Sequence, residues 1–234
     1  MDLIKDKTWE LNSGLPIGPQ LHRILRERIV RNDLISGSKI SESEIANSYL
    51  ISRQPVREAF IKLSEENLIS IRPQRSTIIR KIDPAAVLEA RFVREAIEAD
   101  IVKLLAQKSD PAVVSELRSQ LKEQQKVMDD DPNTFILLDE LFHRTLADAA
   151  DKAGAWRFVE GLKAQMDRVR FLSFSLFPTV RLVRQHEKVI DHIAAGNVQQ
   201  AEKSIRFHLN EILNDLPEIQ AANPDYFLVK YSRT

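Results

Sequence analysis

The stretch that decides the fold is Ser52–Leu63, SRQPVREAFIKL. Its apolar residues recur at helical spacing and form one stripe: Val56, Ala59, Phe60 and Leu63. Ser52 stands where a hydroxyl can cap a helix start, and Pro55 falls in the first turn, where a missing N–H costs nothing. We therefore predict a short helix with one buried side.

Polar residues lie off this stripe, at the N-terminal end of the predicted helix: Ser52, Arg53, Gln54 and Arg57. Arginine can bond the edge of guanine through two hydrogen bonds, glutamine can do the same for adenine, and a helix N-terminus favours phosphate. The stretch is thus a candidate reader of the DNA major groove. The alternative is an ordinary amphipathic surface helix with basic residues.

The flanking sequence places this helix in a larger motif. A first helix is expected over 17–32, and Ser41 with Glu44 forms a capping box that opens a short helix over 42–48. Runs 68–71 and 77–79 predict two strands joined by a basic hairpin tip. Arg72 and Arg75 would lie on that tip, near a phosphate or the minor groove. This order predicts a winged helix-turn-helix.

The composition narrows the class of protein. Of 234 residues, 43% are hydrophobic and only six are glycine, which with long 3.6-residue periodicities favours a mostly α-helical chain. The absence of cysteine excludes disulfides and thiolate metal sites. No apolar run approaches the roughly 20 residues of a membrane span, and the acidic N-terminus lacks the apolar core of a signal peptide. A cytoplasmic protein without membrane contact is expected.

Charge is unevenly distributed along the chain. The net charge is zero, but residues 1–82 carry 14 basic and 10 acidic side chains, whereas 83–234 carry 20 and 24. A small basic module joined to a larger acidic one fits this asymmetry.

The second half of the chain is divided by Asp-Pro pairs at 83–84, 110–111 and 131–132, which place a cap and a proline at helix starts. We predict an antiparallel bundle of six helices at 84–107, 111–129, 132–150, 153–175, 178–195 and 198–215. The domains expected are a mobile arm (1–16), the winged helix-turn-helix (17–82), the helical domain (83–215) and a tail (216–234).

Three of the five histidines and one aspartate form a pattern. Asp139 and His143 are four residues apart and share a helix face, while His186 and His208 lie on the last two predicted helices. Imidazoles and a carboxylate that converge inside a bundle suit a borderline divalent metal ion. The alternative is that each is an ordinary core residue, because Asp-x-x-x-His is common on helices.

The N-terminal part resembles the DNA-binding domain of the GntR family of bacterial transcription regulators. The segments that carry the resemblance are ILRERIV, SGSKISESEIA, SRQPVREAFIKL, EENLI and RPQRST. It implies that Ser52, Arg53, Gln54 and Arg57 face DNA and that Arg75 lies on the wing. The chain departs from the family pattern at three positions, which hold Ser36, Ser43 and Ser76.

Residues 84–215 resemble the FCD ligand-binding domain of the FadR subfamily. In its metal-containing branch, the segments LDELFH, RQHEKVI and RFHL supply the ligands Asp139, His143, His186 and His208. This implies a bound divalent ion, zinc first, with nickel or manganese as alternatives. The segment KAGAWRF lacks an asparagine that is frequent there, and Trp156 can reshape the pocket.

The same resemblance assigns an effector site. Arg94, in VREAIEAD, matches an arginine that pairs with an effector carboxylate, and Arg168 is a second candidate for the same pocket. For Arg94 the alternative is a surface ion pair with Glu98, four residues later.

The expected function is a homodimeric transcription regulator, a repressor on a pseudo-palindromic operator. A small carboxylate, a sugar acid or related organic acid, would bind at the metal site and release DNA. Two alternatives remain: a metal-dependent enzyme, in which the ion activates water, and an architectural DNA-binding dimer without an effector. We expect no enzymatic activity, because no separate general base accompanies the metal pattern.

Overall fold

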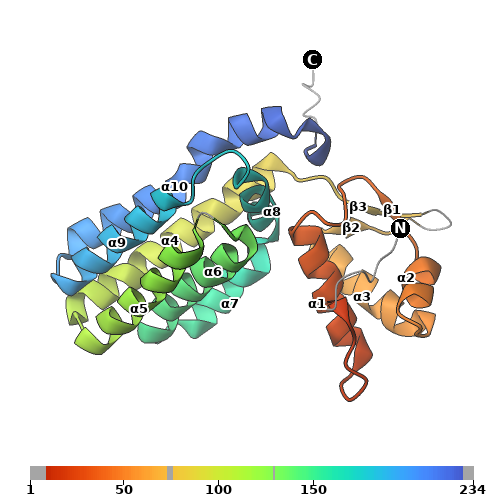
Figure 1. Cartoon of the computed structure of the whole chain (residues 1–234), viewed down its shortest axis with the longest axis horizontal. Helices are drawn as coiled ribbons and strands as arrows, with labels where there is room; N and C mark the ends of the chain where they lie inside the picture. Colours follow the sequence, from red (N-terminus) through yellow and green to blue (C-terminus); the bar gives the residue numbers. More distant parts are fainter. Residues whose placement is uncertain (1–8, 73–75, 129, 229–234) are drawn as a thin grey trace.

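The computed structural model describes residues 9–72, 76–128 and 130–228. Figure 1 shows a small N-terminal domain beside an elongated bundle of helices. Within the described residues no helix is long and apolar enough to cross a membrane.

The N-terminal domain is a winged helix-turn-helix, as predicted. Its elements are α1 (Ile17–Val30), β1 (Lys39–Ile40), α2 (Glu42–Ser48), α3 (Arg53–Glu65), β2 (Ile69–Ser70) and β3 (Thr77–Ile79). The three strands form an antiparallel sheet in the order β1-β3-β2. Strand β1 was not predicted, because two residues are too few to show an alternating pattern.

The apolar stripe of α3 forms the centre of this domain. Val56, Ala59, Phe60 and Leu63 are buried in one cluster with the inner face of α1. Ser41 Oγ accepts a hydrogen bond from the Glu44 amide at 3.1 Å and caps α2, which is one of the two hydrogen bonds of the predicted capping box. Ser52 precedes α3, but its side chain accepts no capping hydrogen bond, so this part of the prediction was wrong.

The segment before α1 is only partly the free arm that was expected. Trp9 is 5% exposed and packs in the core of the domain. The guanidinium carbons of Arg28 and Arg31 lie 5.9 and 5.3 Å from its ring centre. Residues 1–8 of the predicted arm lie outside the described part of the chain.

The helical domain contains α4 (Pro84–Lys108), α5 (Pro111–Val127), α6 (Pro132–Ala149), α7 (Ala153–Leu162), α8 (Ala164–Ser173), α9 (Val180–Ala194) and α10 (Val198–Ala222). The three aspartates of the Asp-Pro pairs cap α4, α5 and α6 through their side chains, as predicted.

Two predicted helix boundaries were wrong. The helix expected over 153–175 is broken at Lys163, directly after the end of α7. The last helical turn of α7 contains Gly161, and glycine is a poor helix former. The break lets α8 change direction and place Ala164 in the core of the N-terminal domain. The last helix continues through Pro217 to Ala222, because its far end buries Leu216 and Ile219 in a separate apolar cluster.

The chain after α10 packs against the linker between the domains. Ile82 and Phe227 form a parallel bridge, with the Ile82 amide donating to the Tyr226 carbonyl at 2.8 Å. Phe227 is 3% exposed and belongs to the apolar cluster that also holds Ile82 and Ile219. This segment therefore closes the junction between the two domains.

We expect Phe227→Ala to lower the free energy of unfolding by roughly 3 kcal/mol, because it removes a buried aromatic ring and leaves a cavity. Urea unfolding measures the loss. The matched control is Leu228→Ala, since that side chain is 41% exposed. Equal losses for the two variants would contradict the packing described here.

Candidate metal centre and DNA-binding surface

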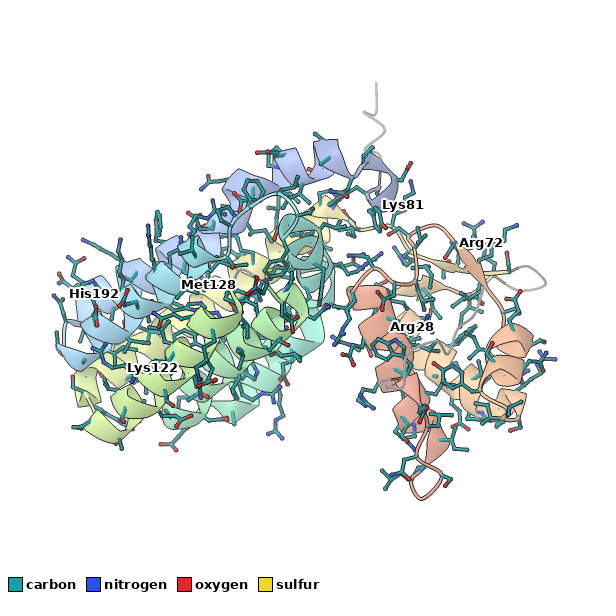
Figure 2. All side chains as sticks on the ribbon, viewed as in Figure 1. Arg28, Arg72, Lys81, Lys122, Met128 and His192 are labelled. Carbon is teal, nitrogen blue, oxygen red and sulfur yellow. The ribbon has the colours of Figure 1, made fainter. Side chains whose placement is uncertain are left out.

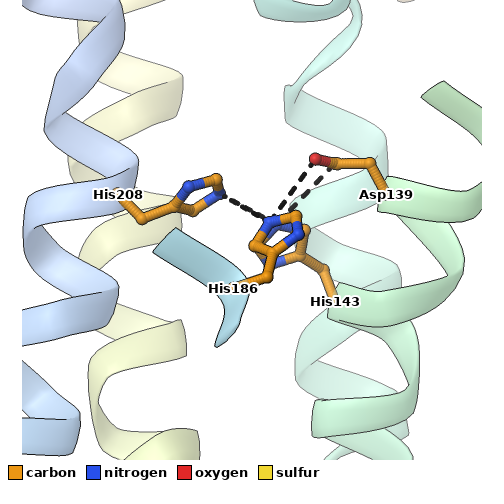
Figure 3. Close-up of side chains that lie close together, drawn as sticks. All are labelled: Asp139, His143, His186 and His208. Atoms are coloured by element: carbon orange, nitrogen blue, oxygen red, sulfur yellow. Dashed lines mark hydrogen bonds and ion pairs between the residues drawn. The ribbon is translucent and has the colours of Figure 1, made fainter. Parts of the chain in front are cut away.

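The four side chains of the predicted metal pattern converge inside the helical domain. Asp139 and His143 come from α6, His186 from α9 and His208 from α10 (Figure 3). Their ligand atoms all lie within 4.8 Å of one another. Nε2 of His208 is 3.3 Å from Nε2 of His186 and 3.2 Å from that of His143. Asp139 Oδ1 lies 3.6 Å from Nε2 of His186.

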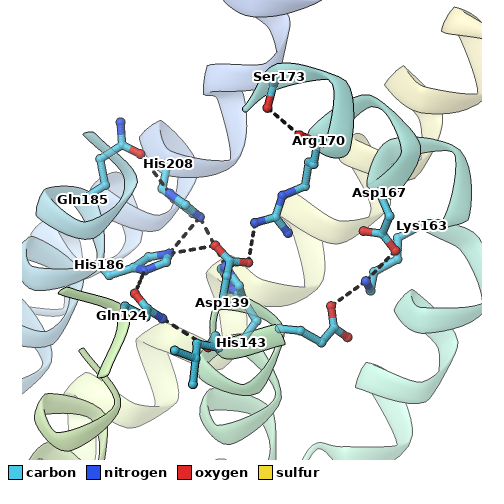
Figure 4. Close-up of polar contacts among 12 residues, drawn as sticks. Gln124, Asp139, His143, Lys163, Asp167, Arg170, Ser173, Gln185, His186 and His208 are labelled. Carbon is cyan, nitrogen blue, oxygen red and sulfur yellow. Dashed lines mark hydrogen bonds and ion pairs between the residues drawn. The ribbon is translucent and has the colours of Figure 1, made fainter. Parts of the chain in front are cut away.

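The outer nitrogen of each imidazole faces an oxygen atom. Nδ1 of His143 lies 2.5 Å from Glu98 Oε2. Nδ1 of His186 lies 2.8 Å from Gln124 Oε1, and Nδ1 of His208 lies 2.9 Å from Gln185 Oε1 (Figure 4). Because these oxygens are acceptors, each Nδ1 carries the proton, and each Nε2 directs a lone pair at the centre.

Three lone pairs that face one another cannot be satisfied by hydrogen bonds among themselves. Asp139 is fully buried, and its Oδ1 accepts no hydrogen bond. Its Oδ2 lies 2.6 Å from Nη2 of Arg170. Three imidazole nitrogens and a carboxylate oxygen are ligands that a divalent ion such as zinc prefers. The residues present therefore fit a metal ion.

Burial sets the protonation of these ligands. It lowers the pKa of His186 to about 3 and that of His208 well below its usual value, so both stay neutral near pH 7. Burial opposes ionisation of Asp139, but the nearby basic groups, of which Arg170 has the largest effect, together outweigh it and hold the pKa of that carboxyl well below its usual range. The site thus presents the neutral imidazoles of His186 and His208 and the carboxylate of Asp139, the forms that bind metal.

A cavity adjoins the centre and is lined by residues of α4, α8, α9 and α10, among them His208, Arg94 and Arg170. Arg94 is 4% exposed, its Nε pairs with Glu98, and its guanidinium carbon lies 5.9 Å from the ring of Trp156. Arg94 therefore forms the expected ion pair with Glu98, but in the interior and not at the surface, and it also borders the cavity. Its contact with an effector carboxylate stays a prediction.

Arg168 was predicted to line the same cavity, and the structure contradicts this. Its Nη1 donates to the Arg80 carbonyl at 2.9 Å and its Nη2 to Ser36 Oγ at 2.6 Å, at the contact with the N-terminal domain. Burial lowers the pKa of Arg168 to about 10. Two residues along a helix point to nearly opposite sides, so Arg170 reaches the cavity instead. The sequence shows both arginines, but it does not indicate which side of α8 faces the cavity.

The predicted DNA-reading residues Ser52, Arg53, Gln54 and Arg57 are all exposed at the N-terminal end of α3. Arg72 is also exposed and lies beside the sheet, away from the bundle (Figure 2). Arg75 lies outside the described residues.

Sequence reasoning missed the role of Glu42 on α2. Arg53 Nη2 lies 2.8 Å from Glu42 Oε2, and Arg57 Nε lies 3.3 Å from Oε1. Hydrogen bonding from Arg57, with the nearby charges, lowers the pKa of Glu42. Exposed ion pairs of this kind contribute little free energy, so phosphates and bases can compete for the arginines. The capping-box pattern explained Glu44 and gave no signal for Glu42.

Comparison with known proteins decides the family. Residues 19–79 match the model of bacterial regulatory proteins of the gntR family, and residues 89–211 match the FCD domain. The chain belongs to the GntR family. It is a DNA-binding transcription regulator with a winged helix-turn-helix and an FCD domain, and relatives of this GntR protein are regulators, not enzymes.

Among its relatives is the HTH-type transcriptional repressor RspR of Escherichia coli K12, 38% identical over 93% of this chain and 96% of that protein. A second relative, a probable D-xylose utilization operon transcriptional repressor of Paenarthrobacter nicotinovorans, is 26% identical. The match covers 68% of this chain and 70% of that protein. The solved structure of E. coli McbR/YncC shares the fold, with a TM-score of 0.74 at 16% identity over 87% and 98% of the two chains.

We expect the stability of the metal-free protein to fall as pH drops below about 6.5, the ordinary histidine pKa. The folded-state pKa values of His186 and His208 lie below that value, so the unfolded chain takes up protons first. Stability is then fully present above pH 6.5 and is lost by on the order of 1 kcal/mol per pH unit for each histidine.

Urea unfolding of chelator-treated protein between pH 7.5 and 5 measures this slope. The variant His186→Gln removes one of the two titrating groups and reduces the slope. A wild-type stability that does not change across this range would contradict the buried, neutral state of these imidazoles.

Proposed function

We propose that this GntR regulator is a repressor whose operator binding is controlled by a small carboxylate, a sugar acid or related organic acid, bound at a metal ion in the FCD domain. The observation that carries the proposal is the convergence of three Nε2 lone pairs and Asp139 at the edge of a cavity that Arg94 also lines. Such a site needs a cation, and a cation beside an arginine attracts an anion.

Zinc fits the donor set best, with nickel or manganese as alternatives. Asp139, His143, His186 and His208 would hold the ion, and Glu98 orients one of the imidazoles. When bound, the metal supplies a positive anchor for a carboxylate oxygen. The planar guanidinium of Arg94 suits a two-point contact with the same carboxylate.

On the DNA side, a homodimer would place two copies of α3 in successive major grooves of a pseudo-palindromic operator. Arg53, Gln54 and Arg57 would read bases, with Ser52, Arg72 and Arg75 contributing backbone or wing contacts. The repressor assignment is supported by RspR, which is named as one.

Helix α8 offers a route between the two sites. Arg170 contacts the ligand Asp139, while Arg168 and Gln165 contact the N-terminal domain. Figure 1 shows α8 at the end of the bundle that faces the small domain. An anion in the cavity competes with Asp139 for Arg170, and a shift of α8 then alters the placement of the DNA-binding domain. The acid can shift this equilibrium only by its affinity difference between the two arrangements.

We expect His208→Ala to lose bound metal and the thermal shift with acids, while operator binding without acid is preserved, because His208 lies in the other domain. Elemental analysis and thermal-shift assays measure the first two effects. The control is His192→Ala, a histidine of α9 outside the metal cluster (Figure 2).

Metal that survives the His208→Ala change would show that the ligand set is wrong. A wild-type protein without metal and without a shift by any acid would favour the architectural DNA-binding dimer.

We expect Arg57→Ala to weaken operator binding about 5- to 150-fold. This range corresponds to the loss of one good base contact, which contributes roughly 1–3 kcal/mol of binding free energy. The side chain is 56% exposed and outside the apolar stripe, so the fold is retained. Gel shifts on an operator selected from random DNA measure the effect. Lys62→Ala, an exposed basic residue at the other end of α3, is the control. Equal affinities of Arg57→Ala and wild type would remove Arg57 from the reading set.

A further inference from the structure

The far end of the cavity holds a second charged group that the metal site does not use. Arg181 of α9 lies between two carboxylates of α10, with Nε 3.0 Å from Glu211 Oε2 and Nη2 paired with Asp215. Its guanidinium carbon lies 5.3 Å from the ring of Phe177. Glu211 and Asp215 are 8% and 9% exposed, and all of these residues line the cavity.

The two carboxylates are aligned with the metal centre. Glu211 and Asp215 follow the ligand His208 by three and seven residues on α10, so they share its face. At 1.5 Å per residue they lie about 4.5 and 10.5 Å farther along the helix axis. The cavity thus runs from the metal centre along α10 to these acids.

The two ends of the cavity differ in charge. At the metal end Arg94 and Arg170 are each paired with a carboxylate, Glu98 and Asp139, so a bound divalent ion would make that end positive. At the far end two carboxylates against the single Arg181 leave one negative charge. The wall between the ends is largely apolar and includes Met166, Val169, Leu209 and Ile212. A dry wall strengthens the electrostatic interactions at both ends.

This difference in charge between the two ends distinguishes three kinds of organic acid. A ligand hydroxyl can donate to Glu211 or Asp215 in a charge-assisted hydrogen bond. A second ligand carboxylate would face like charge in the interior, which is costly. A plain aliphatic acid would leave the buried carboxylates without new donors.

We propose that Glu211 and Asp215 are specificity residues that select a polyhydroxy monocarboxylate, an aldonate of about four to six carbons, and reject the dicarboxylate of the same length. The chain length follows from the spacing along α10. The inference rests on the proposed function, because the ligand carboxylate must bind at the metal end.

Calorimetric titration of the zinc-loaded full chain tests the selection. The probes are three six-carbon aldonates (D-gluconate, D-galactonate and D-mannonate), their matched aldarates, and hexanoate. We expect at least one aldonate to bind at least about tenfold more tightly than its aldarate and than hexanoate. The aldarate differs from the aldonate only by a carboxylate in place of the terminal alcohol.

The variant Glu211→Gln with Asp215→Asn removes both negative charges and frees Arg181. We expect the preference for the aldonate to disappear or to invert, because Arg181 can then pair with the second carboxylate. The single variant Glu211→Gln is expected to reduce the preference in part. The control Glu218→Gln makes the same change on an exposed face of α10 and leaves the preference intact. Metal content and circular dichroism verify that each variant is folded.

The outcomes separate the two proposals. Aldarates or hexanoate that bind the wild type as tightly as every aldonate would overturn the selection and leave the sensor in place. An unchanged preference in the folded double variant would overturn the roles of Glu211 and Asp215. If no acid of any class binds the zinc-loaded protein, the proposed function itself fails, and the selection fails with it.

Discussion

Three imidazole lone pairs that face one another in a dry interior are the constraint on which the helical domain depends. Near neutral pH, each Nδ1 proton is held by Glu98, Gln124 or Gln185, so no imidazole can turn its donor to the centre. These three partners come from α4, α5 and α9, and the ligands from α6, α9 and α10. The packing of the bundle therefore depends on the same side chains as the chemistry of its centre, and a bound divalent ion would satisfy the lone pairs that this packing brings together.

The proposed DNA-binding surface at the N-terminal end of α3 differs from the metal centre in burial. Its side chains are exposed, and their contacts are weak enough to exchange with those of a nucleic acid. Glu42 holds Arg53 and Arg57 near one another across the turn between α2 and α3. The arginines thus begin partly ordered, which lowers the entropy that DNA binding must overcome.

The sequence predicted those features that depend on local rules. Asp-Pro pairs placed three helix starts, the apolar stripe of α3 placed its buried side, and the spacing of Asp139 and His143 put both on one face. It missed what tertiary packing decides: the break at Lys163, the run of α10 past Pro217, and the arginine of α8 that faces the cavity. The outer glutamines were missed for the same reason, because no spacing within α5 or α9 indicates which imidazole each will meet.

Helix α8 is a single ten-residue element that contacts Asp139 on one side and Ser36 on the other. Arg168 is buried there, and its guanidinium donates to the Arg80 carbonyl and to Ser36 Oγ, so its own contact with the N-terminal domain is made through uncharged acceptors. Thermodynamic linkage acts in both directions along such an element. Wherever the acid changes the affinity for an operator, the operator must change the affinity for the acid by the same factor. A regulator molecule bound to DNA would then respond at a different acid concentration from a molecule free in solution. The number of operators in a cell would therefore change the acid concentration at which the regulator responds.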